Sequence, residues 1–198
     1  MKKILILFSH PKFEKSRVNQ ILIHHVTGKE NVTVHDLYEE YPDFNIDVVA
    51  EKELLNTHDV IIWHHPFYWY SCPPLMKQWL DLVLEFNWAY GPKGKALQDK
   101  ICLNAITTGA SKDMYCSKGY NSFTIEQFLR PFEQTAILCG MQYFPPFAVM
   151  GTHTLSDEAL QEYKNNYGKF ITLLQAGLTI NDFENTSFIN DIPQLKQD

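Results

Sequence analysis

The sequence predicts an α/β fold built on a doubly wound sheet of five parallel strands in the order 2-1-3-4-5. Short apolar runs alternate along the chain with longer segments of helical periodicity, which is the pattern of repeated βαβ units. The first, third and fourth apolar runs are hydrophobic nearly throughout, as expected for strands that helices cover on both faces. These two observations favour a parallel sheet between two layers of helices.

The expected elements can be placed in order along the chain. Apolar runs give the strands, at residues 3–9, 31–37, 59–66, 100–109 and 141–151. Helical periodicity gives the helices, at residues 16–26, 47–57, 73–86, 123–140 and 156–177. Ser156 is expected to be the N-cap of the last helix, because acidic residues occupy the turn that follows it.

These elements are expected to form one domain, residues 1–177. A chain of 198 residues is long enough to bury a sizeable core without metals or disulfides. Residues 178–198 show no sustained periodicity and are expected to form a loosely attached C-terminal tail. Phe183, Phe188 and Ile189 in this tail could still pack on the domain or on a partner.

The charge of the chain limits its partners. It carries 17 Lys and Arg against 23 Asp and Glu, a formal net charge of -6, so nucleic acid and anionic membrane are not expected as principal partners. The N-terminal "MKKILILF" is too short in its apolar part for a secretory signal, and no later segment is long and apolar enough to span a bilayer. We therefore expect a cytoplasmic protein.

The cysteines and histidines do not indicate a metal site. The four cysteines are widely spaced and form no CxxC pair, so free thiols are expected, with Cys102 and Cys139 in the core and Cys116 in a polar loop. His64 and His65 are adjacent in an expected strand and should point to opposite faces of the sheet.

The ligand site is expected at the carboxyl ends of the strands, where the strand order reverses between the first and third strands. The loop after the first strand leads into a helix with Ser16, Arg17 and Asn19 at its start. Two hydrogen-bonding side chains, one permanent cation and the free N–H groups of a helix start together suit a phosphate.

Two further loops at the same edge suit the rest of a flavin mononucleotide. Phe67, Tyr68, Trp69 and Tyr70 follow the third strand and offer aromatic walls for a flat ring system. The fourth strand ends in "TTGAS", residues 107–111, whose hydroxyls and glycine allow the backbone to approach a ligand closely. The sequence contains neither GxGxxG nor GxxxxGK[ST], so the usual dinucleotide and triphosphate cradles are absent.

Each of these features also has a purely structural interpretation. Ser16 could be only an N-cap, Arg17 only a solvated charge, and the aromatic run only the edge of the core. The flavin interpretation is preferred because three loops of complementary chemistry meet at one edge of the sheet.

Several motifs in combination resemble the flavodoxin-like NAD(P)H:quinone oxidoreductases. They are "SHP…SRVN", "HPFYWYSCPPLMKQWLD", "WAYG", "TTG" and "FPPFAVMG". Together with "YPDFNID", residues 41–47, they are most similar to the bacterial ancillary flavin reductases of glutathione-gated potassium-efflux systems. The resemblance runs from about Lys3 to about Gly177.

The resemblance implies a homodimeric enzyme that reduces quinones by two electrons in a ping-pong cycle. Its cofactor would be FMN, with FAD as the alternative, and its co-substrate NADPH or NADH. Carried over by position, the cofactor-binding residues would be His10, Ser16, Arg17, Val18, Asn19, Phe67, Tyr68, Trp69, Tyr70, Thr107, Thr108, Gly109 and Ala110. An excess of aromatic residues around Phe86, Trp88 and Tyr90 supports the dimer.

The resemblance also implies one catalytic residue. Family members from mammals stabilise charge on the flavin with a tyrosine and a histidine six positions apart. Here Tyr115 stands at the position of the tyrosine, and Asn121 stands at that of the histidine. An amide cannot carry a proton as imidazole does, so only the hydrogen bond of Tyr115 is expected to be retained.

Two other functions remain open at this point. The resemblance at "YPDFNID" allows a regulatory subunit that docks on a membrane potassium-efflux protein, which would place the chain peripherally at the inner face of the membrane. An electron-transfer flavodoxin is the other alternative, and it is disfavoured because the loop after the third strand lacks an acidic docking surface.

Overall fold

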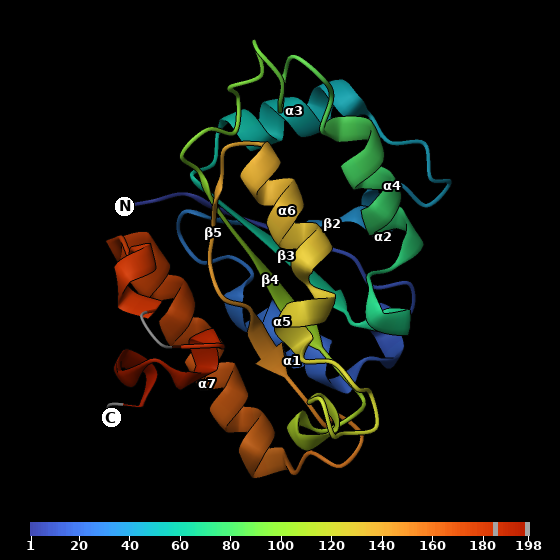
Figure 1. Cartoon of the computed structure of the whole chain (residues 1–198), viewed down its shortest axis with the longest axis vertical. Helices are drawn as coiled ribbons and strands as arrows, with labels where there is room; N and C mark the ends of the chain where they lie inside the picture. The colour runs from blue at the N-terminus through green and yellow to red at the C-terminus, as the bar shows by residue number, and fades with distance from the viewer. Residues whose placement is uncertain (184–185, 197–198) are drawn as a thin grey trace.

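The computed structural model describes residues 1–183 and 186–196 and contains a parallel sheet with helices on both faces (Figure 1). The strand order is β2-β1-β3-β4-β5, with β6 also paired to β4, which confirms the predicted order. The strands are β1 (Ile4–Phe8), β2 (Val32–Asp36), β3 (Val60–Pro66), β4 (Ile101–Thr107), β5 (Gln142–Tyr143) and β6 (Phe147–Val149).

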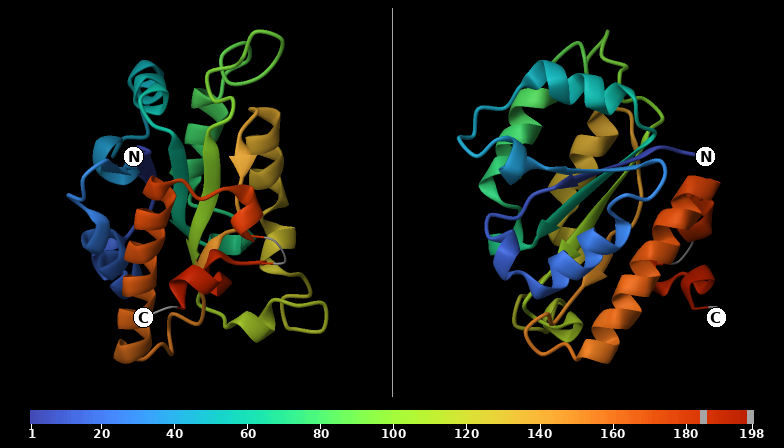
Figure 2. Two further views of the ribbon diagram at one scale, coloured as in Figure 1. Left: turned by 90° about the vertical axis from the view of Figure 1, so that its left-hand side faces the viewer. Right: turned by 180° about the vertical axis from the view of Figure 1, so that it is seen from behind.

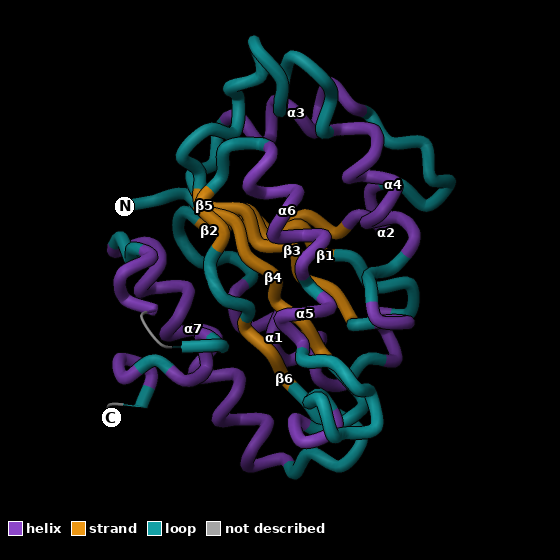
Figure 3. The backbone as a smooth tube through the Cα atoms, viewed as in Figure 1, coloured by secondary structure: helices purple, strands orange, loops and turns teal. Residues whose placement is uncertain are grey.

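The predicted fifth strand, residues 141–151, is divided into β5 and β6. Both segments pair in parallel with β4, Tyr143 opposite Cys102 and Phe147 opposite Ala105 (Figure 3). Pro145 and Pro146 lie between them, and proline has no N–H with which to continue a strand ladder. Within residues 1–183 and 186–196, the sheet therefore has six strands rather than the five expected.

Two layers of helices cover the sheet. The helices are α1 (Arg17–Val26), α2 (Leu37–Glu40), α3 (Val48–Asn56), α4 (Pro74–Val83), α5 (Ile125–Phe128), α6 (Arg130–Leu138) and α7 (Asp157–Ala176). In Figure 1, α6 crosses in front of β3 and β4; from behind, in Figure 2, α1 and α7 cover the opposite face. The predicted helix at 123–140 is interrupted at Leu129, two residues before Pro131.

The alternation of side chains along β1 divides the core between the two faces. Ile4, Ile6 and Phe8 pack with the residues of α1 and α7, whereas Leu5 and Leu7 pack with those of α3, α4 and α6. All five side chains are fully buried, as the continuous apolar run predicts for a two-sided sheet. Cys102 and Cys139 are likewise buried and Cys116 is exposed, as expected.

The last helix begins and ends as its sequence requires. The Ser156 hydroxyl accepts a hydrogen bond from the backbone N–H of Ala159, which confirms Ser156 as the N-cap. Gly177 ends the helix with a φ of 106°, a left-handed conformation that glycine adopts without a steric penalty.

The described part of the segment after Gly177 packs on the domain, contrary to the expected loose attachment. Phe183, Ile189, Ile192 and Leu195 are buried in the same cluster as α1 and α7. The backbone N–H of Ile189 donates to the carbonyl of Pro146 at 3.0 Å. The apolar residues of this segment supply enough buried surface to hold it against β6.

Within the described residues, no helix combines the length and the apolar character needed to cross a membrane.

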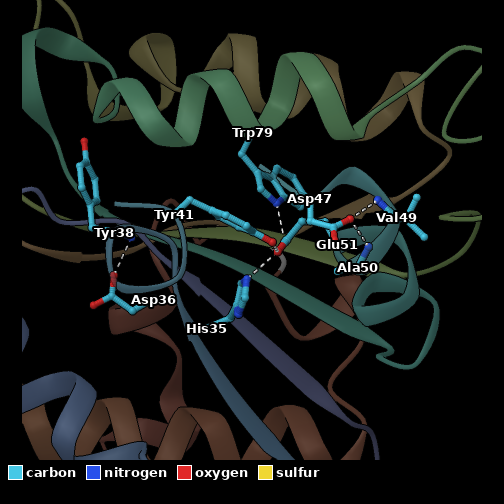
Figure 4. Close-up of polar contacts among 9 residues, drawn as sticks. All are labelled: His35, Asp36, Tyr38, Tyr41, Asp47, Val49, Ala50, Glu51 and Trp79. Atoms are coloured by element: carbon cyan, nitrogen blue, oxygen red, sulfur yellow. Dashed lines mark hydrogen bonds and ion pairs between the residues drawn. The ribbon is translucent and has the colours of Figure 1, made fainter. Parts of the chain in front are cut away.

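A buried carboxylate fixes α3 against the sheet and α4. Glu51, which is 1% exposed, accepts hydrogen bonds from His35 Nε2 at 2.7 Å, the Tyr41 hydroxyl at 2.6 Å and Trp79 Nε1 at 2.6 Å (Figure 4). Three donors, from β2, from the residue that ends α2 and from α4, thus meet on one side chain of α3. Asp47 begins that helix by accepting from the N–H groups of the next turn, as Figure 4 also shows.

Replacing Glu51 should destabilise the fold more at neutral than at acidic pH. Glu51→Ala leaves two buried donors and the partly buried His35 unpaired and should lower the free energy of unfolding by about 3 kcal/mol. Burial raises the pKa of the Glu51 carboxyl, but its hydrogen bonds outweigh burial and hold that pKa below its ordinary value of 4.5. The wild-type advantage is therefore complete above about pH 4.5 and is lost as the pH falls through the folded-state pKa.

Urea unfolding of Glu51→Ala at several pH values measures this effect. Glu53→Ala is the control, because Glu53 lies on the same helix and is exposed. Equal losses in the two variants would contradict the role given to the cluster.

Candidate functional site

A pocket of about 320 Å³ opens at the carboxyl ends of β1, β3 and β4. Its size lies at the lower end of the range for small-molecule sites. The residues that line it are His10, Lys12, Lys15, Ser16, Arg17, Val18, Asn19, Pro66, Phe67, Tyr68, Thr107, Gly109, Thr152 and His153. It lies where the strand order reverses, as the sequence predicted.

The structure brings most of the predicted cofactor-binding residues to this pocket. Those that line it are His10, Ser16, Arg17, Val18, Asn19, Phe67, Tyr68, Thr107 and Gly109. Thr108, Ala110, Trp69, Tyr70 and the candidate catalytic Tyr115 do not line it. Thr108 is instead buried behind the loop, and its hydroxyl donates to the Ala110 carbonyl at 2.6 Å.

The side chains of the aromatic loop after β3 lie in different surroundings. Phe67 is buried and donates its N–H to the Thr107 carbonyl at 2.8 Å, which holds the start of the loop against β4. Trp69 and Tyr70 both have positive φ, 49° and 63°, a conformation unusual for bulky side chains. The Trp69 side chain is 92% exposed, so the four aromatics do not form a single wall.

Asn19 organises the polar floor of the pocket. Its amide nitrogen is 2.8 Å from the Ser16 hydroxyl and 3.1 Å from the Thr107 hydroxyl, and its amide oxygen is 3.0 Å from His64 Nε2. Ser16 occupies the N-cap position of α1, but its hydroxyl caps no N–H group of the helix. The first-turn N–H groups therefore have no side-chain cap from Ser16, an arrangement suited to an anionic ligand.

Three cations surround the entrance. Lys12, Lys15 and Arg17 line the pocket and are exposed, so they contribute positive potential at its mouth. Arg17 is only partly available, because its Nη2 donates to the Leu155 carbonyl at 2.7 Å and lies 3.1 Å from an Asp157 carboxylate oxygen.

Sequence reasoning missed four polar residues that line the pocket. Lys12 and Lys15 lie in the same loop as Ser16, but the prediction considered only the residues at the start of the helix. Thr152 and His153 follow the last strand, and the backbone pairing of Thr152 with Thr108 brings them to the site. The rule that parallel strands end at a common edge could have identified "GTHT" as a pocket loop.

Gly109 makes room for His153. A Cβ atom built on Gly109 would lie 2.6 Å from His153 Nε2, closer than any ordinary contact. The absent side chain thus lets the loops after β4 and β6 close on each other at the pocket.

Tyr115 packs beside Phe67 and does not itself line the pocket. Its ring centroid is 6.0 Å from that of Phe67, which does line the pocket. Burial raises the pKa of the Tyr115 phenol, so it remains a hydrogen-bond donor at neutral pH. Among the described residues, the Asn121 side chain makes no hydrogen bond to Tyr115. Its amide oxygen instead accepts from the Tyr70 hydroxyl at 3.2 Å.

The buried imidazoles near the site are uncharged at neutral pH. Burial lowers the pKa of His64 to about 3 and that of His10 below its ordinary value. His65 points to the opposite face, where Nε2 is 3.0 Å from the Asn104 amide nitrogen, as expected for adjacent strand residues. The pocket therefore combines neutral hydrogen-bonding groups in its floor with fixed cations at its rim.

A family model described as flavodoxin-like fold matches residues 2–171. The chain belongs to this family. It is 44% identical over 173 residues to the uncharacterized NAD(P)H oxidoreductase YdeQ of Bacillus subtilis, which covers 87% of this chain and 88% of the relative. It is 43% identical over 169 residues to the glutathione-regulated potassium-efflux system ancillary protein KefG of Serratia proteamaculans, covering 85% and 92%.

Solved structures agree with this assignment. General stress protein 14 of Treponema denticola, in complex with FMN, superposes with a TM-score of 0.80 at 40% identity over 88% of this chain and 98% of that one. The NADPH-quinone reductase of P. pentosaceus superposes with a TM-score of 0.78 at 32% identity, over 85% and 96%.

Proposed function

We propose that the protein is an NAD(P)H:quinone oxidoreductase that carries FMN in the pocket at the carboxyl edge of the sheet. One observation carries this proposal: hydroxyl donors, cations and aromatic side chains meet at the point where the strand order reverses. The similarity to an NAD(P)H oxidoreductase, to an NADPH-quinone reductase and to a protein in complex with FMN supports it. FAD would use the same phosphate end and is the alternative cofactor.

The residues of the pocket fit a flavin mononucleotide. Ser16 and Thr107, with the first turn of α1, would hold the phosphate, and Lys12, Lys15 and Arg17 would balance its charge. Phe67 and Tyr68 would flank the ring system. The backbone from Thr107 to Ala110 would contact its polar edge, where Gly109 adds no side chain.

The bound flavin would supply the hydride chemistry, accepting from NAD(P)H and delivering to a quinone. The chain's contribution is binding, orientation and exclusion of water. Tyr115, with its raised pKa, can donate a hydrogen bond toward charge on the ring without losing its proton at neutral pH. Asn121 cannot store a proton, and it acts here as the acceptor for the Tyr70 hydroxyl.

The proposed enzyme is a cytoplasmic homodimer. Trp69, Phe86 and Tyr120 are 92%, 60% and 87% exposed, and their rings offer apolar surface against which a second copy would pack. Trp69 lies in the loop that also supplies Phe67 and Tyr68 to the pocket, so a second copy packed against it would also shield the ring end of the cofactor.

A second candidate function is supported by the similarity to KefG. In that case the chain would dock on a membrane potassium-efflux protein at the inner face of the membrane and regulate it. Co-purification of the tagged chain with such a transporter would support this role, and its absence with a fully active reductase would leave catalysis as the main function.

The reductase proposal is tested by anaerobic titration of the FMN-loaded protein. NADPH and then NADH are added while the visible absorption of the flavin is followed, and a quinone is added at the end. We expect full bleaching by at least one nucleotide and full recovery with quinone. Failure to retain flavin, or bleaching that stops half-way, would refute the proposal and favour the regulatory subunit or the electron carrier respectively.

Tyr115→Phe should slow reduction of the flavin by NAD(P)H about tenfold or more, since one hydrogen bond to developing charge is lost. FMN affinity should be unchanged, because Tyr115 does not line the phosphate pocket. Stopped-flow reduction measures the rate, with the exposed Tyr120→Phe as control. An unchanged reduction rate in Tyr115→Phe would remove this role.

Arg17→Gln should weaken FMN binding about threefold to tenfold at low salt, as expected for one charge-assisted hydrogen bond partly offset by Asp157. The difference should shrink as salt is added. Fluorescence titration measures both affinities. Arg130→Gln is the matched control, since Arg130 also pairs with one carboxylate but lies on α6 outside the pocket; equal effects of the two variants would mean that Arg17 is only a surface charge.

A further inference from the structure

A chain of buried polar contacts leads from the last helix to the floor of the pocket. The Tyr167 hydroxyl on α7 is 3.0 Å from His64 Nδ1 on β3, and His64 Nε2 is 3.0 Å from the Asn19 amide oxygen on α1. The Asn19 amide nitrogen then contacts the hydroxyls of Ser16 and Thr107. Tyr167, His64 and Asn19 are each buried to 99% or more, so solvent takes no part in this chain.

The donor and acceptor of each hydrogen bond in this series of contacts follow from its buried end, the Tyr167 hydroxyl. Within residues 1–183 and 186–196, the Tyr167 phenol has no hydrogen-bond partner besides His64. A buried hydroxyl hydrogen without an acceptor is costly, so Tyr167 donates and His64 Nδ1 accepts. Burial keeps His64 neutral, with its pKa near 3, so the ring carries one proton and that proton is on Nε2.

The remaining contacts are then fixed in turn. His64 Nε2–H donates to the Asn19 amide oxygen, and the two N–H bonds of the Asn19 amide donate to Ser16 and Thr107. Both hydroxyls thus use a lone pair within the protein and keep their own hydrogen free. Because Ser16 and Thr107 line the pocket, each can present that hydrogen to a ligand.

Packing holds the members of this chain in place. The His64 ring lies edge to face between Phe8 and Tyr167, with centroids 5.4 Å and 5.5 Å away. Gly168 allows α7 to lie close against α1, since a Cβ atom there would be 2.4 Å from His25 Nε2. The reversed arrangement, in which both hydroxyls would donate to the Asn19 amide and point lone pairs at the ligand, would leave the buried Tyr167 hydroxyl hydrogen without an acceptor and is therefore disfavoured before any ligand binds.

We propose that Tyr167 and His64 are positioning residues that orient the Ser16 and Thr107 hydroxyls as donors, so that this end of the pocket selects a phosphate ester. The proposal rests on the proposed function in that FMN supplies the phosphate. Neither Tyr167 nor His64 lines the pocket, so both act through Asn19.

The first test compares FMN with riboflavin, which lacks the phosphate. Tyr167→Phe keeps the ring and removes the donor that sets the direction. We expect FMN to bind about threefold to tenfold more weakly to this variant, while riboflavin binding is unchanged. Tyr163→Phe on the same helix is the control and should change neither affinity. Equal weakening of FMN and riboflavin, or no weakening of FMN, would overturn the positioning role.

The second test reads the direction of the chain without flavin. Long-range ¹⁵N–¹H correlation spectra of the histidines distinguish the two neutral tautomers of His64 in the wild-type protein and assign its signals by comparison with His64→Gln. We expect a protonated Nε2 and an unprotonated Nδ1, and a mixture of tautomers in Tyr167→Phe. A protonated Nδ1 in the wild type would overturn the proposal.

The two tests separate this inference from the proposed function. The inference fails while the proposed function stands if the wild-type protein binds FMN and is reduced by NAD(P)H, but His64 carries its proton on Nδ1. The same holds if Tyr167→Phe does not weaken FMN binding relative to riboflavin binding. If the wild-type protein retains no flavin, the proposed function fails, and the selection of a phosphate ester fails with it.

Discussion

The buried amide of Asn19 is the contact on which the site depends. It lies in the first turn of α1 and joins three other parts of the molecule: Ser16 in the preceding loop, His64 on β3 and Thr107 on β4. A side chain that is 1% exposed must satisfy all its polar atoms within the protein, so these elements can take only one arrangement around it. The position of the helix start relative to both strands, and hence the shape of the pocket floor, follows from that requirement.

β3, the strand that carries His64, also carries a second chain of polar contacts on its opposite face. His65 donates through Nδ1 to the Pro66 carbonyl and accepts through Nε2 from Asn104, whose amide oxygen accepts from the Tyr143 hydroxyl at 2.6 Å. The two chains differ in their ends: the one through His64 reaches the pocket, and the one through His65 ends on β5. Adjacent histidines on a buried strand are therefore each paired within the core, and only one of them is coupled to the site.

The sequence was sufficient for the fold and for the location of the pocket. The hydrophobic periodicity and the composition of the segments predict the parallel sheet. Because the carboxyl ends of parallel strands meet at one edge of the sheet, Ser16, Phe67 and Thr107 are predicted to lie together there. It was not sufficient where a contact joins distant parts of the chain. Tyr167 meets His64 across 103 positions, and no local pattern on α7 marks that tyrosine as different from its neighbours.

Local backbone geometry accounts for other differences. The positive φ values of Trp69 and Tyr70 belong to a turn that leaves the Trp69 side chain exposed, and a propensity argument gives no reason to expect such values in bulky residues. Pro145 and Pro146, which divide the predicted last strand, can be read from the sequence. That both halves still pair with β4 cannot, because this pairing depends on a strand about 40 residues earlier in the chain.

A crystal structure of the complex with FMN tests the central claim most directly. The account predicts that the phosphate lies within hydrogen-bond distance of both the Ser16 and Thr107 hydroxyls, at the start of α1, with the ring system against Phe67. A phosphate bound elsewhere, or a flavin whose phosphate contacts the rim cations but neither hydroxyl, would contradict it.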